Sequence, residues 1–522
     1  MFHKAVAQLE AWRSHPPGRP STRRPGPGAA RAAGTGLAAD RGRAVGSVPA
    51  PAAAGIAAGD ATDGPRAIGA ANGPAAGPGP DQGGARTRVT SSASLTARPP
   101  APGPAAALGP APEHDLPPEI LICDTTLCDG ELAPGVAFSQ DEKLRIAERL
   151  AALGVPLIEA GFPAVSAEEV AAVRAIVEAE LGAAIQVIAR PLKHDIDMAV
   201  HSGAHRIALC VGTSDVHVQR KLRTDRAQLL RQIRDGVGYA RQSGRQIVFV
   251  AEDAVRADPG FLVTALCAAA DAGADAVGLA DTAGIGTPHS VAALVRRVAA
   301  ACPLPITVHC RNDLGLATAN TIAALGSGAT GAQCAVLGLG GRAGNASLEE
   351  LVLALEVGYH IRTGLDLRGL APLARQVAAL AGQVIGPARP VIGRNAFLHE
   401  SGLRTSGVVR EPGLYEAYPP ELVGRSRGFA VGPDSGRAGV GTILGRYGLD
   451  LADSQLDSLI EDIRRRDFSG EPLREDELLR MARAVTERDG ARPGRRAVGD
   501  WSGPGMLSPW PAADRGAAKG AG

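Results

Sequence analysis

The sequence predicts an α/β protein built on a (β/α)8 TIM barrel, followed by a small linking subdomain and C-terminal helices. Short β-branched runs alternate with amphipathic helical stretches, and the runs are apolar throughout, as in strands that are buried on both faces. Eight such repeats fit a closed barrel of parallel strands better than an open doubly wound sheet, because no glycine-rich phosphate loop follows the first run. The expected strands are 119–123, 156–160, 185–189, 206–211, 246–250, 275–280, 305–309 and 332–337.

Local signals mark where helices begin. Ser139 with Glu142, and Ser166 with Glu169, have the spacing of capping boxes and predict helices after the first two strands. The strand–helix pattern stops after about residue 364. Residues 390–436 are rich in Gly, Pro and Arg, whereas 449–485 have the periodicity of two amphipathic helices.

Both ends of the chain differ in composition from the middle. Residues 1–115 consist largely of Ala, Pro, Gly and Arg, a composition that buries too little apolar surface to offset the entropy of ordering. We therefore expect a disordered tail over 1–115, a barrel over 116–370, a linking subdomain with helices over 371–490, and a second tail over 491–522.

Composition excludes several classes of function. No run of about 18 apolar residues predicts a membrane span. The 7 cysteines include no CxxC pair, which favours a reduced compartment, and we expect a cytoplasmic protein. A formal net charge of +1 and 3% aromatic residues give no footprint of nucleic-acid binding.

Polar residues follow most of the expected strands. A barrel carries its catalytic groups at the carboxyl ends of its strands, so these residues are the candidates for a site. Any one of them could be a helix cap or a loop residue, but together they place carboxylates, a histidine and arginines around one opening. They are Asp124, Cys128, Asp129, Glu159, Arg190, Glu252, Asp253, Asp281, Thr282, His309, Arg311, Asn312, Asp313 and Asn345.

Several segments resemble the homocitrate synthase/2-isopropylmalate synthase family. They are DTTLCDGE (124–131), HCRNDLGLATAN (309–320), GLGGRAGNASLEE (338–350), NAFLHESG (395–402) and ELVGRSR (421–427), and their order and spacing extend the resemblance over about 119–485. The resemblance implies an acyltransferase that condenses acetyl-CoA with a 2-oxo acid and hydrolyses the resulting thioester. It also implies a divalent metal (Mg, Mn or Zn) that orients and polarises the oxo acid.

The resemblance also implies roles for individual residues. The metal ligands would be Asp129, His309 and Asn345. Glu159, Arg190 and Thr282 would bind substrate, and Glu252 and Tyr415 would be catalytic.

Other positions depart from the family. Arg311 stands where a metal-binding histidine is expected, and a guanidinium offers no lone pair. A unit charge about 4 Å from a cation costs about 4 kcal/mol at a dielectric constant of about 20, and a divalent ion roughly doubles this, so we expect weakened metal binding. Cys128 stands where the family keeps an arginine, and Thr307, Gly341 and Arg404 depart as well. Two interpretations follow: an active enzyme with a rearranged site, or a catalytically impaired member that binds a ligand or partner subunit.

The substrate expected from the resemblance is 2-oxoglutarate, which gives homocitrate. The chain ends soon after Val485, where isopropylmalate synthases carry a further regulatory domain, and APGV (133–136) and VGRSR (423–427) look most like homocitrate synthases that supply the nitrogenase cofactor. The alternatives are 2-oxoisovalerate, as in 2-isopropylmalate synthase, and pyruvate, as in citramalate synthase. Family members pair, so a homodimer is expected.

Overall fold

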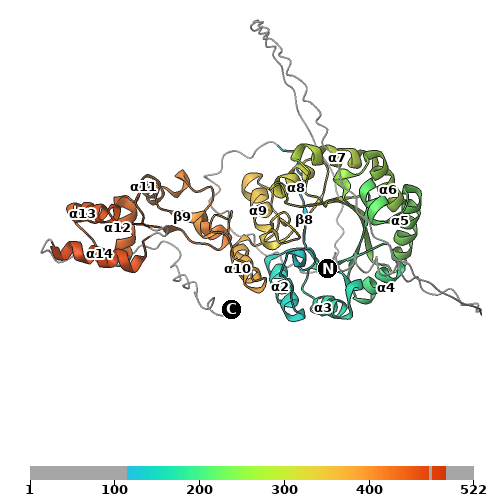
Figure 1. Ribbon diagram of the computed structural model, residues 1–522, viewed down its shortest axis with the longest axis horizontal. Helices are drawn as coiled ribbons and strands as arrows, with labels where there is room; N and C mark the ends of the chain where they lie inside the picture. Colours follow the sequence, from blue (N-terminus) through green and yellow to red (C-terminus); the bar gives the residue numbers. More distant parts are fainter. Residues whose placement is uncertain (1–113, 469–472, 489–522) are drawn as a thin grey trace, which may run out of the picture. The chain divides into compact units, whose positions relative to one another are not determined.

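The computed structural model describes residues 114–468 and 473–488; apart from His114 and Asp115, the predicted tails lie outside them. Eight parallel strands form one closed barrel in the order β1 to β8, and helices surround them (Figure 1). The barrel, rather than an open sheet, is therefore confirmed. The strands are β1 (Leu121–Asp124), β2 (Leu157–Glu159), β3 (Ala184–Ala189), β4 (Arg206–Gly212), β5 (Gln246–Glu252), β6 (Ala276–Asp281), β7 (Ile306–Cys310) and β8 (Gly331–Cys334).

The register of the strands aligns the ends that carry polar residues. The barrel closes where β1 pairs with β8, with Asp124 opposite Cys334. On the next strand, His309 of β7 lies opposite Gln333 of β8. All eight predicted strands overlap the observed ones, because runs that are apolar on both faces are buried between the barrel interior and the helices.

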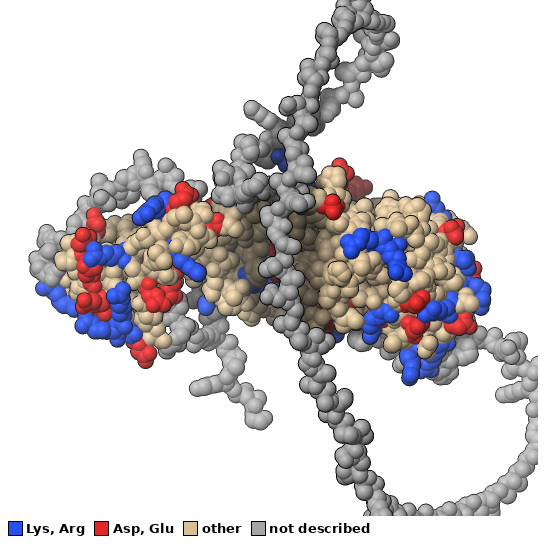
Figure 2. Space-filling view, turned by 90° about the horizontal axis from the view of Figure 1, so that it is seen from above, with Lys and Arg blue, Asp and Glu red and all other residues tan. Residues whose placement is uncertain are grey.

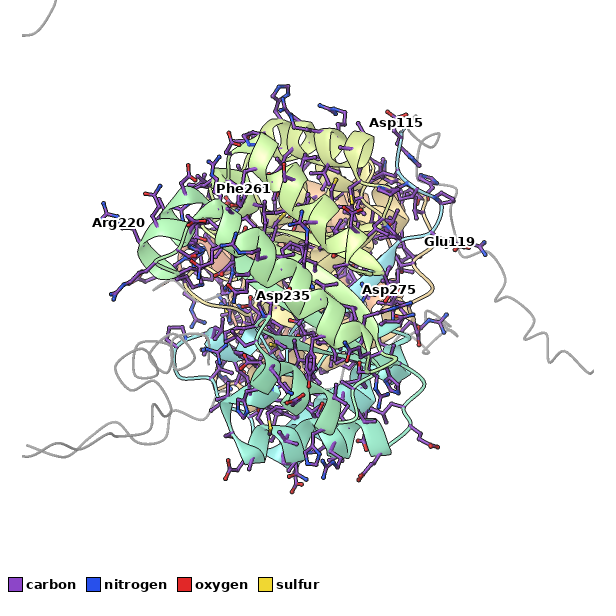
Figure 3. All side chains as sticks on the ribbon, turned by 90° about the vertical axis from the view of Figure 1, so that its right-hand side faces the viewer. Asp115, Glu119, Arg220, Asp235, Phe261 and Asp275 are labelled. Atoms are coloured by element: carbon purple, nitrogen blue, oxygen red, sulfur yellow. The ribbon has the colours of Figure 1, made fainter. Side chains whose placement is uncertain are left out.

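Helices cover the outside of the barrel: α2 (Gln140–Leu153), α3 (Ala167–Glu178), α4 (Lys193–His201), α5 (Arg226–Arg241), α6 (Pro259–Asp271), α7 (Pro288–Ala301), α8 (Ala317–Leu325) and α9 (Leu348–Leu353). The side formed by α5 and α6 faces the viewer in Figure 3, where Phe261 of α6 is labelled. Phe261 is buried, and the Arg226 guanidinium lies 4.9 Å from its ring centre. This pair joins the first turn of α5 to α6.

One predicted capping box forms completely, and the second forms only its first hydrogen bond. Ser139 accepts a hydrogen bond from the Glu142 N–H, and the Glu142 carboxylate accepts one from the Ser139 N–H. Ser166 likewise accepts from the Glu169 N–H. The Glu169 carboxylate does not return to Ser166, because it is bound by Lys143 and by the Phe162 N–H.

The chain after the barrel is more regular than its composition predicts. Helix α10 (Leu370–Leu380) packs against α2, and Val391, Phe397 and Val423 join the core of the barrel. Helix α11 (Gly402–Arg410) interrupts the Gly- and Pro-rich stretch, and a two-residue strand β9 (Leu398–His399) pairs with β10 (Gly428–Phe429). Sequence periodicity missed α10 and α11.

The last helices form a second core. They are α12 (Arg437–Arg446), α13 (Asp453–Arg464) and α14 (Glu475–Arg488), of which the last two confirm the predicted amphipathic pair. Val440, Ile443, Leu459, Ile463 and Leu478 are all buried in this cluster. Each helix therefore turns its apolar face toward the other two.

The helices of the described chain are short or carry a polar face. Among residues 114–468 and 473–488, no helix has the length and apolar character that a bilayer span requires. On the face drawn in Figure 2, basic and acidic side chains lie interspersed, without a continuous basic surface among the described residues.

A buried ion triad connects the first two strand–helix loops. The Lys143 ammonium of α2, 2% exposed, lies 2.9 Å from a Glu131 oxygen and 2.7 Å from a Glu169 oxygen. Glu131 also accepts from the Phe138 N–H, and Glu169 from the Phe162 N–H. Burial raises the pKa of Glu131, and the charge of Lys143 opposes that shift. Lys143 thereby holds the loop that contains DGEL, directly after Cys128.

We expect Lys143→Met to destabilise the protein strongly, because two buried carboxylates lose their shared cation. Breaking a buried ion pair on one side costs about 3–5 kcal/mol. Urea unfolding followed by circular dichroism measures the loss. The matched control is Lys193→Met, whose exposed ammonium lies 5.1 Å from the Tyr239 ring centre and whose loss should cost less than about 1 kcal/mol. Equal losses in the two variants would contradict a structural role for the triad.

Candidate active site

Three segments that are far apart in the sequence meet at the carboxyl end of the barrel. Asp129 follows β1, His309 and Arg311 lie at the end of β7, and Asn345 lies in the loop after β8. An isolated antiparallel bridge between Arg311 and Asn345 draws the last two segments together. The side chains of His309, Arg311 and Asn345 therefore lie around one carboxylate, that of Asp129.

Hydrogen bonds and charge hold this group of side chains. Arg311 Nη2 donates to Asp129 Oδ1 at 2.5 Å, and Asn345 Nδ2 donates to Asp129 Oδ2 at 2.6 Å. His309 Nε2 lies 3.5 Å from Asp129 Oδ2. Asp129, Arg311 and Asn345 are all buried. The structure thus brings together the three residues predicted to bind metal, with Arg311 among them.

The arrangement does not fit a divalent metal ion. Asn345 Oδ1 is buried without a hydrogen-bond partner among the described residues, as a ligand oxygen would be. Both oxygens of Asp129, however, already accept hydrogen bonds, and one of the donors is a guanidinium that would repel a cation. Among the described residues, no group of three His, Cys, Asp or Glu side chains has metal-binding geometry. The Arg311–Asp129 ion pair is therefore a structural reason to expect weakened metal binding.

His309 is placed as a neutral imidazole. Burial lowers its pKa, Arg311 lowers it further, and the Asp129 charge opposes them. The neighbouring side chains of Gln333 and Asn345 also oppose the shift. The side chain is 12% exposed, so it can contact a ligand at the barrel opening.

A second acidic group lies deeper, at Glu159 of β2. Gln186 Nε2 of β3 donates to Glu159 Oε2 at 2.7 Å, and the nearby Cys128 acts to lower the pKa of Glu159. Burial raises the pKa of Glu159 to about 7, and the nearby Asp129 charge adds to the shift. Burial also raises the pKa of the Cys128 thiol, which is 6% exposed. Position 128 therefore carries a neutral thiol where the resemblance implies a cation.

Glu252, predicted to be catalytic, lies at the end of β5, on the other side of the barrel from Asp129. Its partners there are basic. Lys221 Nζ lies 2.6 Å and 2.7 Å from the two Glu252 oxygens, and His217 Nδ1 lies 3.7 Å from one of them. Burial acts to raise the pKa of Glu252, but the neighbouring His217 and the charge of Lys221 outweigh it and lower the pKa. Glu252 is held as a carboxylate.

The remaining predicted residues have other partners. Arg190 Nη2 donates to Asp195 at 2.8 Å, and its guanidinium lies 5.8 Å from the Phe162 ring centre. Thr282 Oγ1 accepts from the Asp253 N–H at 2.9 Å. Tyr415 lies after α11, in the chain beyond the barrel, and is 46% exposed.

The positions that the resemblance marks as departures have different surroundings. Gly341 lies against Arg311, whose Nη1 donates to the Gly341 carbonyl at 3.4 Å, and Cys128 immediately precedes Asp129. Thr307 is buried within β7 and donates to the Val277 carbonyl at 3.4 Å. Arg404, by contrast, is exposed on α11.

Sequence reasoning missed four residues that shape the site: Gln186, His217, Lys221 and Gln333. Gln186 and Gln333 are polar residues inside otherwise apolar strands, and that signal could have identified them. His217 and Lys221 belong to a single π-helical turn (His217–Lys221) after β4, which no sequence pattern marks.

Comparisons with known proteins identify the family of this chain. The HMGL-like family matches residues 119–377, and a domain described as homocitrate synthase post-HMGL domain-like matches 391–469. A probable 2-isopropylmalate synthase of Ignicoccus hospitalis is 41% identical over 72% of this chain and 94% of its own length. A homocitrate synthase of Methanopyrus kandleri is 39% identical over 74% of this chain and 97% of its own. A 2-isopropylmalate synthase of Sulfolobus acidocaldarius is 40% identical over 66% of this chain and 90% of its own length.

These relatives are matched over nearly their whole length, through both the barrel and the chain that follows it. The chain therefore belongs to the HMGL-like family, among the homocitrate and 2-isopropylmalate synthase-like acyltransferases.

Proposed function

We propose that the protein condenses acetyl-CoA with 2-oxoglutarate and water to give homocitrate and CoA. The observation that carries the proposal is the convergence of Asp129, His309, Arg311 and Asn345 at the carboxyl end of a closed barrel. Catalytic groups of such barrels lie at this end. The match of residues 391–469 to the post-HMGL domain of homocitrate synthases supports the choice of oxo acid.

The reaction needs a base, a group that stabilises the oxyanion, and water. The base removes a proton from the acetyl methyl group, and the resulting carbanion forms a bond to the keto carbon of the oxo acid. The keto oxygen takes up the negative charge and then a proton, and water cleaves the thioester to release CoA. In this scheme Glu252, which is held ionised, accepts protons, and Tyr415 donates them.

The side chains around Asp129 are suited to stabilise the oxyanion that forms on the keto oxygen. Arg311 supplies a fixed positive charge, and His309 and Asn345 lie beside it. Preorganised donors in a buried site stabilise such an oxyanion more strongly than water does. Glu159, Arg190 and Thr282 are proposed to contact the rest of the oxo acid.

A second candidate function is that of a family member without turnover that binds a ligand or partner subunit. The ion pair between Arg311 and Asp129, together with the neutral thiol at Cys128, favours it, because both alter the charges at the reacting end of the site. The two candidates differ in one measurable property, which is release of CoA.

We also propose a homodimer in the cytoplasm that supplies homocitrate for the nitrogenase cofactor. Exposed apolar side chains gather on α11 and the turn after it: Leu403 is 77% exposed, Leu414 58% and Val409 49%. A second copy of the chain would bury them beside Tyr415. The likeness of APGV and VGRSR to homocitrate synthases of nitrogen-fixing bacteria supports the metabolic role. Light scattering of the purified protein tests the dimer.

We expect CoA release to be fastest with 2-oxoglutarate. A coupled thiol assay with acetyl-CoA compares 2-oxoglutarate, 2-oxoisovalerate and pyruvate at equal concentrations. Faster turnover with 2-oxoisovalerate would indicate a 2-isopropylmalate synthase. Faster turnover with pyruvate would indicate a citramalate synthase, and one 39% identical relative is named as a putative citramalate synthase. The absence of turnover with all three would support the second candidate function.

We expect Glu252→Gln and Tyr415→Phe each to lower kcat by about 10²–10⁴-fold, because each removes a proton-transfer group. The KM for 2-oxoglutarate should change little, since neither residue is assigned to hold the oxo acid. The controls are Glu148→Gln, on the exposed face of α2, and Tyr447→Phe, whose residue is 49% exposed. A change in KM without a change in kcat would contradict the assigned roles.

A further inference from the structure

Arg311 holds the position at which a metal ion would neutralise Asp129. Its Nη2 lies 2.5 Å from Asp129 Oδ1, and the residue is 8% exposed. Asn345 Nδ2 occupies the other carboxylate oxygen at 2.6 Å. The buried carboxylate thus has a cation and two hydrogen bonds from the protein itself, and an ion would have to displace a charge-assisted bond to reach it.

The residues next to Arg311 leave room for its guanidinium. A Cβ atom built at Gly341 would lie 3.2 Å from Arg311 Nη1, tighter than an ordinary van der Waals contact. The Gly341 carbonyl accepts from the same nitrogen. Next to Asp129 the chain has the buried Cys128 and no basic residue, so no second cation competes for the carboxylate from that side. Two positions in separate segments, Gly341 and Cys128, are therefore compatible with an arginine here.

The guanidinium has an unused donor. Arg311 Nε is buried and has no hydrogen-bond partner among the described residues. An unsatisfied N–H on a buried cation is costly unless a ligand accepts from it. The carboxylate and carbonyl oxygens of a 2-oxo acid are acceptors only, and guanidinium groups match carboxylates in geometry.

We propose that Arg311 is a built-in cation that replaces the divalent metal and binds the carboxylate of the 2-oxo acid directly. This inference rests on the proposed function for the class of ligand. Its consequence is that the protein binds the 2-oxo acid without any bound metal.

The first experiment uses the full-length wild-type chain and two probes. Equilibrium dialysis against Mn²⁺ measures bound metal, and isothermal titration calorimetry measures 2-oxoglutarate binding with and without EDTA. We expect no stoichiometric Mn²⁺ and the same Kd for 2-oxoglutarate in both buffers. Stoichiometric Mn²⁺, loss of binding in EDTA, or no binding in either buffer would each overturn the inference.

Two variants test Arg311 itself. Arg311→Gln removes the charge and should weaken 2-oxoglutarate binding by about tenfold or more, because a charge-assisted hydrogen bond is lost. Arg311→His frees Asp129 Oδ1 and adds a lone pair, so it should gain Mn²⁺ and make 2-oxoglutarate binding sensitive to EDTA. Unchanged 2-oxoglutarate binding by Arg311→Gln, or a folded Arg311→His that gains no Mn²⁺, would contradict the proposal.

The matched control is Arg241→His on α5. Arg241 pairs with Asp275, which is labelled in Figure 3, at a surface position 53% exposed. We expect it to bind 2-oxoglutarate as the wild type does and to gain no Mn²⁺. Circular dichroism verifies that each variant folds; if an Arg311 variant does not, the wild-type measurements still decide.

Failure of the inference can be distinguished from failure of the proposed function. Metal-free binding of 2-oxoglutarate without CoA release would leave the inference intact and overturn the proposed reaction. CoA release that depends on bound Mn²⁺ would support the reaction and overturn the inference.

Discussion

Closure of the barrel is the constraint that sets the positions of all the other elements around the site. Strand β1 pairs along its whole length with β8, from Leu121 opposite Gly331 to Asp124 opposite Cys334. That pairing places the loop after β1 beside the loop after β8, and β7 adds its own end next to them. The backbone therefore makes Asp129, His309, residue 311 and Asn345 neighbours. The side chains at these few positions then decide the chemistry of the site.

Three of the five positions that are expected to depart from the family lie together around Asp129. Arg311 contacts both Asp129 and Gly341, and Cys128 precedes Asp129 in the chain. A buried carboxylate must be paired with positive charge, and here an arginine of the same chain provides it. Burial lowers the pKa of His309, and the charge of Arg311 adds to that shift. Arg404, which is exposed on α11, lies outside this connected group.

Beyond the barrel, the two remaining motifs of the resemblance meet through one carboxylate. Glu416 accepts from Arg427 Nε at 2.7 Å, and its Oε1 lies 3.0 Å from His399 Nε2. This network joins β9 to β10 and positions the chain around Tyr415. Together with the pairing of β9 and β10, it holds the NAFLHESG and ELVGRSR segments side by side.

Local patterns along the chain were sufficient to predict the barrel, its strands and the residues at its opening, because runs buried on both faces and the polar residues that follow them can be recognised from neighbouring positions. They also marked Arg311 as incompatible with a metal ligand, because the chemistry of a guanidinium does not depend on its surroundings. Three pairings became evident only in the folded chain: Arg311 binds Asp129, 182 residues away, Glu169 turns to Lys143 instead of completing its cap, and Lys221 holds Glu252. These pairings depend on which segments the closed barrel brings together, and no spacing along the chain encodes that.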